Sequence, residues 1–392
     1  MKDVLVVCPQ QRDVRLAESG PLTARYRVRF AGPDLDVTDV SPEALLDELA
    51  DLPADAVVGT KDRSALVAAL LAERLRLPGP HPTAVVACQH KPTSRGIQQR
   101  VAPEATPRFA LLDGSPPFPA PWFVKPVVGR LSQEARRVNN DAELQTVAER
   151  AGYRDGYAQI AGLAGLASGT VHGFLVEELV EGDEVTLEGY VHDGRVRTIG
   201  VTDSVKYPGT NSFQRFEYPS ALSTDRLHEL EELTALLVPA HGLDHCFFNA
   251  EFLVPATGPA KIVELNARIA SQFSPLVQAV DGRSTYDALF ALACGKDPAW
   301  MGSETRGVAI SYVIRAFEDA LVAAVPEPEE NLEVLVRPGR RLSEQGANDS
   351  ASFRLAIFTE WAATREEAVA RCAERVSSLR FQLEPVEAIP HR

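Results

Sequence analysis

The chain has 392 residues, of which 45% are hydrophobic and 24% are charged, and its 40 Lys+Arg against 54 Asp+Glu give a net charge of −14. This balance argues against a general nucleic-acid or anionic-membrane binder, because either would need a basic surface. The five cysteines form no CxxC pair, no stretch approaches the ~18 apolar residues of a membrane span, and the first apolar run is too short for a signal peptide. We therefore expect a cytoplasmic protein with reduced thiols that binds neither nucleic acid nor a membrane.

The first ninety residues alternate between short apolar segments and amphipathic ones. Three apolar segments are predicted to be strands: Val4–Cys8, Ala56–Gly59 and Ala84–Cys88. A helix is expected to begin at Pro42, with Ser41 as its capping hydroxyl, and another is expected over Ser64–Leu75. This βαβ rhythm predicts a parallel sheet. The sequence contains neither GxGxxG nor GxxxxGK, so the usual dinucleotide and P-loop sites are not expected.

The middle of the chain begins with a proline-rich connection over residues 103–121. Two strands and one helix are predicted beyond it: Trp122–Val128, Phe174–Glu178 and the helix Asp141–Arg150. The small residues 161–170 are predicted to form a loop. Two hairpins follow, pairing Val185–His192 with Val196–Thr202 and Phe247–Val254 with Lys261–Ile269. The first encloses Asp193-Gly194, a strong turn signal.

Helices and a small sheet are predicted for the rest of the chain. Leu227–Ala240 has an amphipathic pattern that Gly242 can terminate, and Thr285–Cys294 is expected to be a further helix. From about residue 306 the pattern indicates a small sheet and one helix, for which Thr364 and Glu367 form a capping box.

The second hairpin carries the most informative polar residues. Alternate side chains of a strand share one face, so Glu264, Asn266 and Arg268 are expected to project together. Asn249 and Glu251 share a face of the partner strand. In matching register, two carboxylates and an amide oxygen converge, and such hard oxygen ligands suit Mg²⁺ or Mn²⁺ beside a nucleotide's phosphates. The alternative is an edge hairpin with a solvated polar face.

Two other segments suit different parts of a nucleotide. Lys125 lies in an otherwise apolar strand, where it is costly unless it pairs with or binds an anion such as phosphate; the alternative is an edge lysine that snorkels to water. The strand Phe174–Glu178 runs into paired carboxylates and a glycine turn, an arrangement that suits backbone contacts to adenine, with Glu184 placed for ribose hydroxyls. A solvated acidic turn is the simpler interpretation of that segment.

In this order, the three segments resemble the ATP-grasp superfamily and, within it, the carboxylate–amine ligases. The resemblance covers roughly residues 91–300 and rests on the lysine of FVKP, on LVEELVEGDE and on the pair AEFLV and KIVELNARI. It implies an α/β and α+β chain in which two lobes close on ATP. We expect an N-terminal βαβ parallel-sheet domain, an ATP-grasp core and a small, mostly antiparallel C-terminal domain, with these bounds: 1–90, 91–305 (lid subdomain about 91–173) and 306–392.

The resemblance also implies a role for individual residues. Lys125 resembles the lysine that contacts the nucleotide phosphates, and Lys91 one that opens the grasp region. Four residues resemble those that bind adenine and ribose: Glu177, Glu178 and Val180 as the hinge, and Glu184 as the ribose ligand. Three resemble metal ligands that face ATP: Glu251, Glu264 and Asn266. Arg268 resembles the arginine that faces an acyl phosphate, which with Lys125 makes up the expected catalytic pair.

One loop departs from the family pattern. Relatives carry a glycine-rich loop such as GxGSxGV, but here only Gly129 and Ser132 match, and Glu134 stands where a glycine allows close approach to phosphate. Either Arg130 or Arg136 supplies charge in an altered closure, which we favour, or nucleotide binding is weakened. Lys206 and Arg215 lie in a further loop that we expect to be solvated, although basic residues there would suit acyl phosphate chemistry.

These features predict an ATP-dependent ligase that forms an amide from a small-molecule carboxylate and an amine through an acyl phosphate, with Mg²⁺ or Mn²⁺ as the metal. The resemblance suggests an amino acid as one substrate, and a homodimer stays open because dimers occur among relatives. Two alternatives also stay open: another acceptor, such as a thiol or bicarbonate, and a non-catalytic module that binds ATP for regulation.

Overall fold

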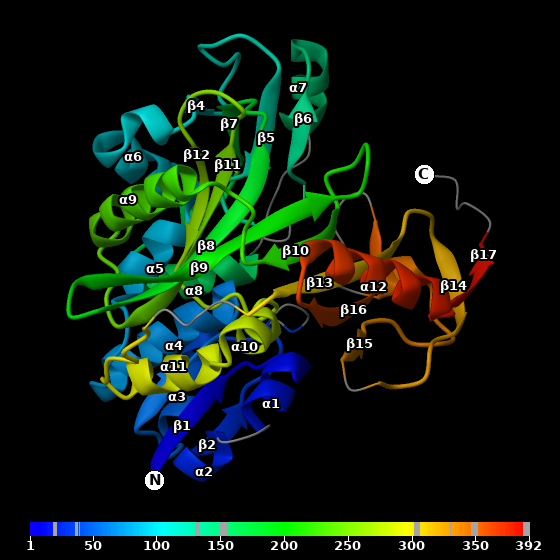
Figure 1. Cartoon of the computed structure of the whole chain (residues 1–392). Coiled ribbons are helices and arrows are strands. Elements are labelled where there is room, and N and C mark those ends of the chain that lie inside the picture. Colours follow the sequence, from blue (N-terminus) through cyan, green and yellow to red (C-terminus); the bar gives the residue numbers. More distant parts are fainter. Residues whose placement is uncertain are drawn as a thin grey trace.

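The computed structural model describes residues 1–18, 22–35, 38, 40–129, 134–148, 155–301, 306–329, 331–345 and 352–386. Their strands form four sheets, of three, eight, two and four strands. Figure 1 shows the eight-stranded sheet across the middle of the molecule, with the N-terminal sheet below it and the four-stranded sheet above. None of the helices in this described part is both long and apolar enough to cross a membrane.

The N-terminal sheet is parallel, as the sequence predicts. Its strands lie in the order β2 (Tyr26–Ala31), β1 (Lys2–Val7) and β3 (Ala56–Val58). Four helices accompany it: α1 (Gln11–Glu18), α2 (Leu22–Arg25), α3 (Pro42–Ala50) and α4 (Asp62–Leu75). The predicted cap of α3 is present, because the side chain of Ser41 accepts a hydrogen bond from Ala44 N. This domain therefore presents the first turn of α4 at the carboxyl end of β3.

The strand predicted at Ala84–Cys88 is wrong, because α5 (Pro82–Gln89) is a helix with His81 as its N-cap. Residues 84, 85, 86 and 88 are all buried, so the segment is apolar on nearly every side. Periodicity cannot distinguish a fully buried helix from a buried strand. The helix packs against both α4 and β12 (Lys261–Asn266), and one buried cluster runs from Leu66 and Val85 to Phe248 and Leu265. The core is thus continuous between the N-terminal domain and the central sheet.

The four-stranded sheet covers the site from the other side. Its antiparallel strands lie in the order β4 (Phe109–Leu111), β7 (Phe174–Glu178), β5 (Trp122–Pro126) and β6 (Arg136–Val138). Five helical segments belong to this part of the chain: α6 (Lys91–Val101), η1 (Pro103–Ala105), α7 (Asp141–Ala148), α8 (Asp155–Leu163) and η2 (Ser168–Val171). Of these, α8 packs against α4. The loop predicted at 161–170 is therefore wrong in part, because α8 extends to Leu163 and buries Ala161.

The central sheet is antiparallel, in the order β12-β11-β8-β9-β10-β13-β16-β15. The bounds of its remaining strands are β8 (Asp183–His192), β9 (Arg195–Lys206), β10 (Phe213–Tyr218), β11 (Cys246–Val254), β13 (Val308–Ala316), β15 (Leu332–Val334) and β16 (Phe353–Ala362). Both predicted hairpins are present, as β8–β9 and β11–β12. The C-terminal region extends this sheet through β13, β16 and β15, so its strands are mostly antiparallel as expected but join the central sheet.

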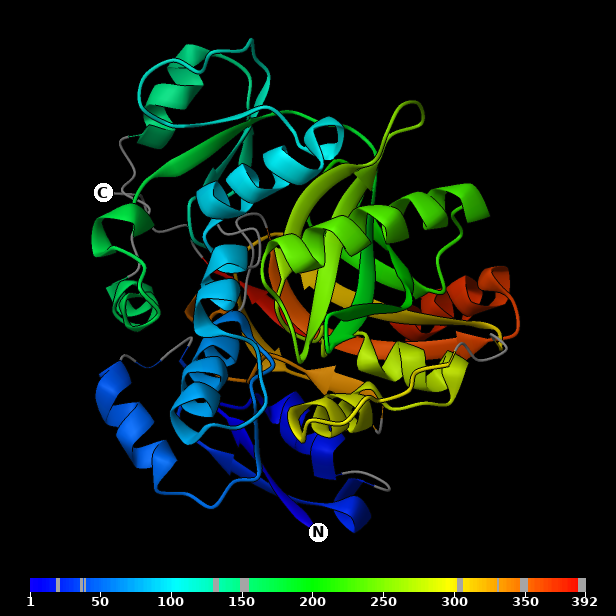
Figure 2. The same ribbon diagram turned by 90° about the vertical axis from the view of Figure 1, so that its left-hand side faces the viewer.

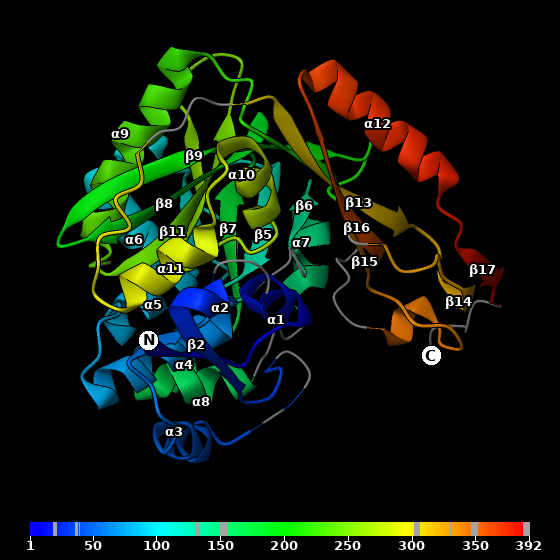
Figure 3. The ribbon, with the colours of Figure 1, turned by 60° about the horizontal axis from the view of Figure 1, so that its bottom comes forward.

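Helices cover both faces of the central sheet. Figure 2 shows α9 (Thr224–Ala240) lying across β8, β9 and β11. Figure 3 shows α10 (Ser274–Asp281) and α11 (Thr285–Ala293) between the central and N-terminal sheets. The last elements are β14 (Ala320–Ala324), η3 (Leu342–Glu344), α12 (Arg365–Ser378) and β17 (Gln382–Pro385). The predicted cap of α12 is present, with the Thr364 side chain accepting from Glu367 N.

Candidate active site

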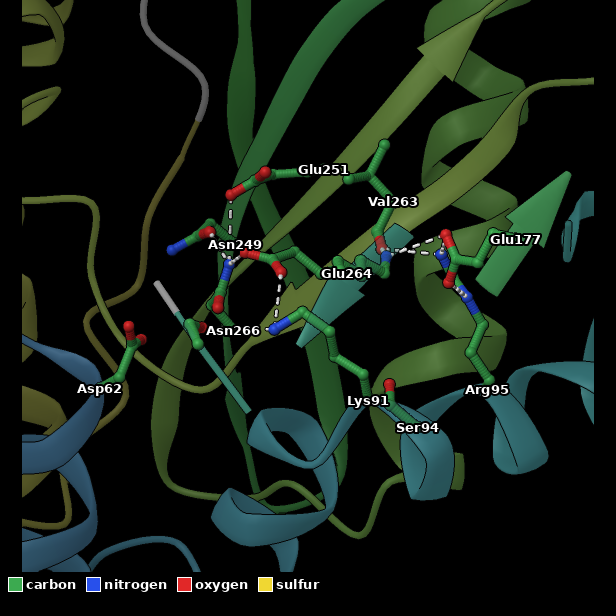
Figure 4. Close-up of polar contacts among 12 residues, drawn as sticks. Asp62, Lys91, Ser94, Arg95, Glu177, Asn249, Glu251, Val263, Glu264 and Asn266 are labelled. Atoms are coloured by element: carbon green, nitrogen blue, oxygen red, sulfur yellow. Dashed lines mark hydrogen bonds and ion pairs between the residues drawn. The ribbon is translucent and has the colours of Figure 1, made fainter. Parts of the chain in front are cut away.

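The hairpin β11–β12 brings four polar side chains together. Asn249 pairs with Asn266 and Glu251 with Glu264, which is the register that the sequence analysis requires. Nδ2 of Asn266 lies 2.9 Å from Asn249 Oδ1, 3.2 Å from Glu251 Oε1 and 3.3 Å from Glu264 Oε1. Figure 4 shows these side chains converging from the two strands. We call these four residues the acidic cup.

The acidic cup holds two carboxylates, and Lys91 is the one described cation that forms an ion pair with either of them. Desolvation raises the pKa of Glu251 well above its usual range, and the charges of Glu264 and Glu184 add to that rise. Lys91 Nζ approaches Glu264 Oε2 only to 4.0 Å. Like charges brought together out of water favour a bound cation.

Oxygen donors of this kind fit Mg²⁺ or Mn²⁺. The two carboxylates present oxygens directly. Asn266 presents its NH₂ group to both of them, so a half-turn of the amide puts Oδ1 toward a cation. The residues present thus fit the metal that the sequence analysis expects.

Arg268 lies just beyond β12, where it meets the N-terminal domain. Its Nε forms an ion pair with Asp62 in the first turn of α4, and its Nη1 lies 3.4 Å from Ile269 O. Burial lowers the pKa of Arg268, but Asp62, followed by the two carboxylates of the acidic cup, raises it by more. Sequence reasoning missed Asp62. The available signal was its place after β3, since the carboxyl ends of parallel strands are where ligands bind in open α/β sheets.

A second group of charged residues lies on the side of the four-stranded sheet. Arg95 Nε is 2.6 Å and Lys125 Nζ is 2.9 Å from the carboxylate of Glu177, and all three side chains are buried. We call these three residues the ion-paired cluster. Arg95 Nη2 also donates to Val263 O at 3.0 Å, and Lys125 Nζ lies 3.4 Å from the same oxygen. Since Val263 precedes Glu264, the cluster fixes the backbone of β12 beside the acidic cup.

The pKa shifts in the ion-paired cluster follow from this pairing. Burial raises the pKa of Glu177, but Arg95 and Lys125 more than offset it and hold the value at about 2. Burial lowers the pKa of Lys125 to about 8, although Glu177 opposes that change. The Glu177 carboxylate is therefore occupied by its ion pairs with Arg95 and Lys125. The adenine-hinge role expected for this residue would use its backbone and not its side chain. Arg95 was not predicted, because nothing in α6 marks it as buried.

A cavity of about 430 Å³ connects the acidic cup with the ion-paired cluster. Eight of the predicted site residues line it: Lys91, Lys125, Glu177, Glu178, Val180, Glu184, Glu251 and Glu264. Asn266 and Arg268 lie beyond its lining. The structure therefore brings residues from α6, β5, β7, β8, β11 and β12 to one cavity, as the sequence analysis expects of a nucleotide site.

The rim of the cavity modifies two further expectations. Glu178 pairs with Arg108 at 2.7 Å, and its backbone N donates to Arg108 O. Glu184 pairs with Lys206 at 2.8 Å, and both line the cavity, so the solvated loop expected for Lys206 is wrong. Arg215 instead pairs with Glu217, at 2.6 Å.

The glycine-poor loop is described only at its two ends. Arg130 and Ser132 lie outside the described residues. Lys91 Nζ donates to Gly129 O at 3.2 Å, and Arg136 Nε lies 3.5 Å from Glu134 O. Glu134 has φ of 61°, a left-handed conformation that favours glycine.

Comparisons with known proteins concern the domain and the fold of this chain. Residues 118–275 match the family model of the ATP-grasp domain. The chain resembles the crystal structure of the L-amino acid ligase from Bacillus licheniformis, with a TM-score of 0.77 and 18% identity over 98% of this chain and 99% of that one. It also resembles phosphoribosylglycinamide synthetase from Anaerococcus prevotii (TM-score 0.69, 14% identity, 98% of this chain and 100% of that one).

A third similar structure contains a nucleotide. It is the biotin carboxylase domain of the Hydrogenobacter thermophilus 2-oxoglutarate carboxylase in complex with MgADP, ADP and bicarbonate (TM-score 0.71, 16% identity, 98% of this chain and 91% of that one). No curated protein matches the sequence. At these identities the structural likeness concerns the fold.

Proposed function

From a chain that has an ATP-grasp domain and the ATP-grasp fold over its full length, we propose an ATP-dependent, ADP-forming ligase that joins a carboxylate to an amine. The observation that carries the proposal is the acidic cup, in which Glu251 and Glu264 face each other across β11 and β12 with Asn266 between them. The likeness to an L-amino acid ligase supports an amino acid as at least one substrate.

In this proposal the cavity binds the adenine and ribose of ATP, and the acidic cup binds the metal ion at its phosphates. Val180 and the backbone that follows β7 line the part of the cavity that suits adenine, and Glu184 lines the part that suits the ribose. Glu251, Glu264 and Asn266 would hold Mg²⁺, which when bound supplies positive charge to the phosphate oxygens. Lys91 and Lys125 line the same cavity and add two fixed cations.

The proposed chemistry needs position and charge rather than a protein nucleophile. A substrate carboxylate oxygen attacks the γ-phosphorus, the bond to the β-phosphate oxygen breaks, and ADP and an acyl phosphate form. The amine nitrogen then attacks the acyl carbon, phosphate leaves, and the nitrogen loses a proton. Arg268 lies next to the acidic cup and, in this scheme, holds the carboxylate and then the oxyanion. An arginine has five N–H donors, so the contact with Asp62 leaves donors for a substrate.

Hydroxylamine trapping tests the first half of this scheme. The chain is incubated with Mg-ATP, hydroxylamine and a panel of amino acids. An amino acid that is a substrate should give its hydroxamate, with one ADP released for each hydroxamate formed. Arg268→Ala should abolish both products while leaving Mg-ATP binding in place. A hydroxamate without amide product over many amines would favour another acceptor, such as a thiol or bicarbonate. Mg-ATP binding without any ADP release would favour a regulatory module instead.

A further inference from the structure

A cluster of imidazoles and carboxylates lies at the end of the central sheet away from the acidic cup. His192 is the last residue of β8, Asp193 follows it in the hairpin turn, and His245 directly precedes β11. Val191 pairs with Cys246, so the two histidines come side by side from neighbouring strands. His245 precedes Glu251 by six positions, which is on the order of 20 Å along an extended strand. We propose that this histidine–aspartate cluster binds Zn²⁺.

The distances within the cluster suit a shared metal ion. Ligand atoms of His192, Asp193 and His245 all lie within 4.8 Å of one another. His192 Nδ1 is 3.5 Å from Asp193 Oδ2, and His245 Nε2 is 3.4 Å from Asp193 Oδ1. Two atoms bound to one tetrahedral Zn²⁺ at about 2.0–2.1 Å lie about 3.3–3.4 Å apart. Small side-chain movements therefore bring these three groups onto one ion.

Asp244 lies beside these three groups and is already oriented. Its carboxylate accepts hydrogen bonds from Gly194 N at 3.2 Å and from His245 N at 2.8 Å. Asp244 Oδ2 lies 4.0 Å from His245 Nε2. Backbone donors of this kind orient metal ligands from behind. The set of two imidazoles and one carboxylate matches the nitrogen and oxygen ligands that Zn²⁺ takes, whereas Mg²⁺ prefers oxygen alone.

The negative charge of the cluster is not balanced by a lysine or arginine among the described residues. The carboxylates of Asp193 and Asp244 are both negatively charged, and no described lysine or arginine forms an ion pair with them. A divalent cation balances this charge. Asp193 is 71% exposed, which leaves the cluster open to an ion from solvent.

Zinc titration of the metal-free, full-length chain by calorimetry tests the proposal, and it needs no activity as a readout. The wild type should bind one Zn²⁺ that His192→Phe binds at least tenfold more weakly. Asp193→Asn should lose affinity to a similar extent. Its fold is safe because Asn-Gly is a favoured turn sequence here, where residues 193 and 194 have φ of 50° and 70°. Magnesium in excess should not displace the zinc.

The chain offers a matched control in His228 on α9. This histidine is also beside carboxylates, 3.3 Å from Glu232, but it is 69% exposed and belongs to no cluster of ligands. His228→Phe should therefore keep the zinc affinity of the wild type. Wild-type affinity in both His192→Phe and Asp193→Asn would overturn the proposal. So would a thiolate charge-transfer band on replacing zinc by Co²⁺, because it would assign the ion to a cysteine such as Cys246.

Discussion

The acidic cup and the ion-paired cluster are adjacent in the fold, yet their charges are balanced in opposite ways. In the cluster, Glu177 has two cations within 3.0 Å, and its pKa falls to about 2. In the cup, Glu251 faces another carboxylate, and its pKa rises well above the usual range. A carboxylate whose partners are already present supports structure, whereas one whose partners are missing is prepared for a ligand.

The two sites are also physically connected. The ion-paired cluster binds Val263 O, and the next residue of β12 is Glu264. Arg95 and Lys125 of the ion-paired cluster thus hold β12, the strand that positions Glu264 in the acidic cup. Changes in the two sites should therefore separate stability from activity. Four substitutions in these sites and a fifth at Asp62 test that separation.

The largest effect is expected for Glu251→Gln or Glu264→Gln in the acidic cup. Either change removes a metal-binding charge, so carboxylate-dependent ADP formation should fall by about 10³-fold or more, on the scale of one lost transition-state contact. The free energy of unfolding without metal should stay within about 1 kcal/mol of the wild type, because removal of one carboxylate relieves like-charge repulsion. Coupled assays for ADP and urea unfolding measure the two quantities. A loss of several kcal/mol in unfolding free energy would show instead that these carboxylates support the structure, as Glu177 does.

The next largest effect is expected for Glu177→Gln in the ion-paired cluster, and it is an effect on stability. Glu177→Gln leaves Arg95 and Lys125 buried without their carboxylate, which should cost about 3–5 kcal/mol in unfolding free energy. The pH dependence gives a second readout. Because the folded-state pKa of Glu177 is about 2, below its ordinary 4.5, its stabilisation is present above pH 4.5 and is lost as the pH falls toward 2. The unfolding free energy of the wild type in urea should fall over this pH range. That of Glu177→Gln should fall by less, because the contribution of Glu177 is absent.

A smaller effect on activity is expected at Asp62. Asp62→Asn removes the charge that anchors Arg268, and misplacement of a positioned group can cost about 100-fold in rate. The loss should appear in kcat and in KM for the carboxylate substrate, while calorimetry gives an unchanged Kd for Mg-ATP. Asp55, which precedes β3 and pairs with Lys2 at 2.9 Å, provides the matched control. If Asp55→Asn is equally impaired, the effect belongs to the N-terminal domain as a whole.

These residues also show where sequence reasoning succeeds and where it stops. The acidic cup was predictable because strand alternation fixes the faces of β11 and β12, and the short connection between them fixes their register. The ion-paired cluster was not, because Arg95 and Glu177 lie 82 positions apart and no local pattern pairs them. Asp62 and Arg268, 206 positions apart, are the same case. The helix at Pro82–Gln89 was missed because its apolar residues carry no period.

The smallest effect on activity is expected for Lys125→Met, which acts within the ion-paired cluster itself. Glu177 keeps both contacts with Arg95, at 2.6 and 3.0 Å, so no buried charge is left alone. Burial already lowers the pKa of Lys125 to about 8, which means that its charge is poorly accommodated there. We expect unfolding free energy within about 1 kcal/mol of the wild type, since replacement of a buried charge by an apolar group of similar shape is often neutral. Activity should still fall at least tenfold, because a cation that lines the nucleotide cavity is lost. A stability loss as large as that of Glu177→Gln would show instead that Lys125 is primarily structural.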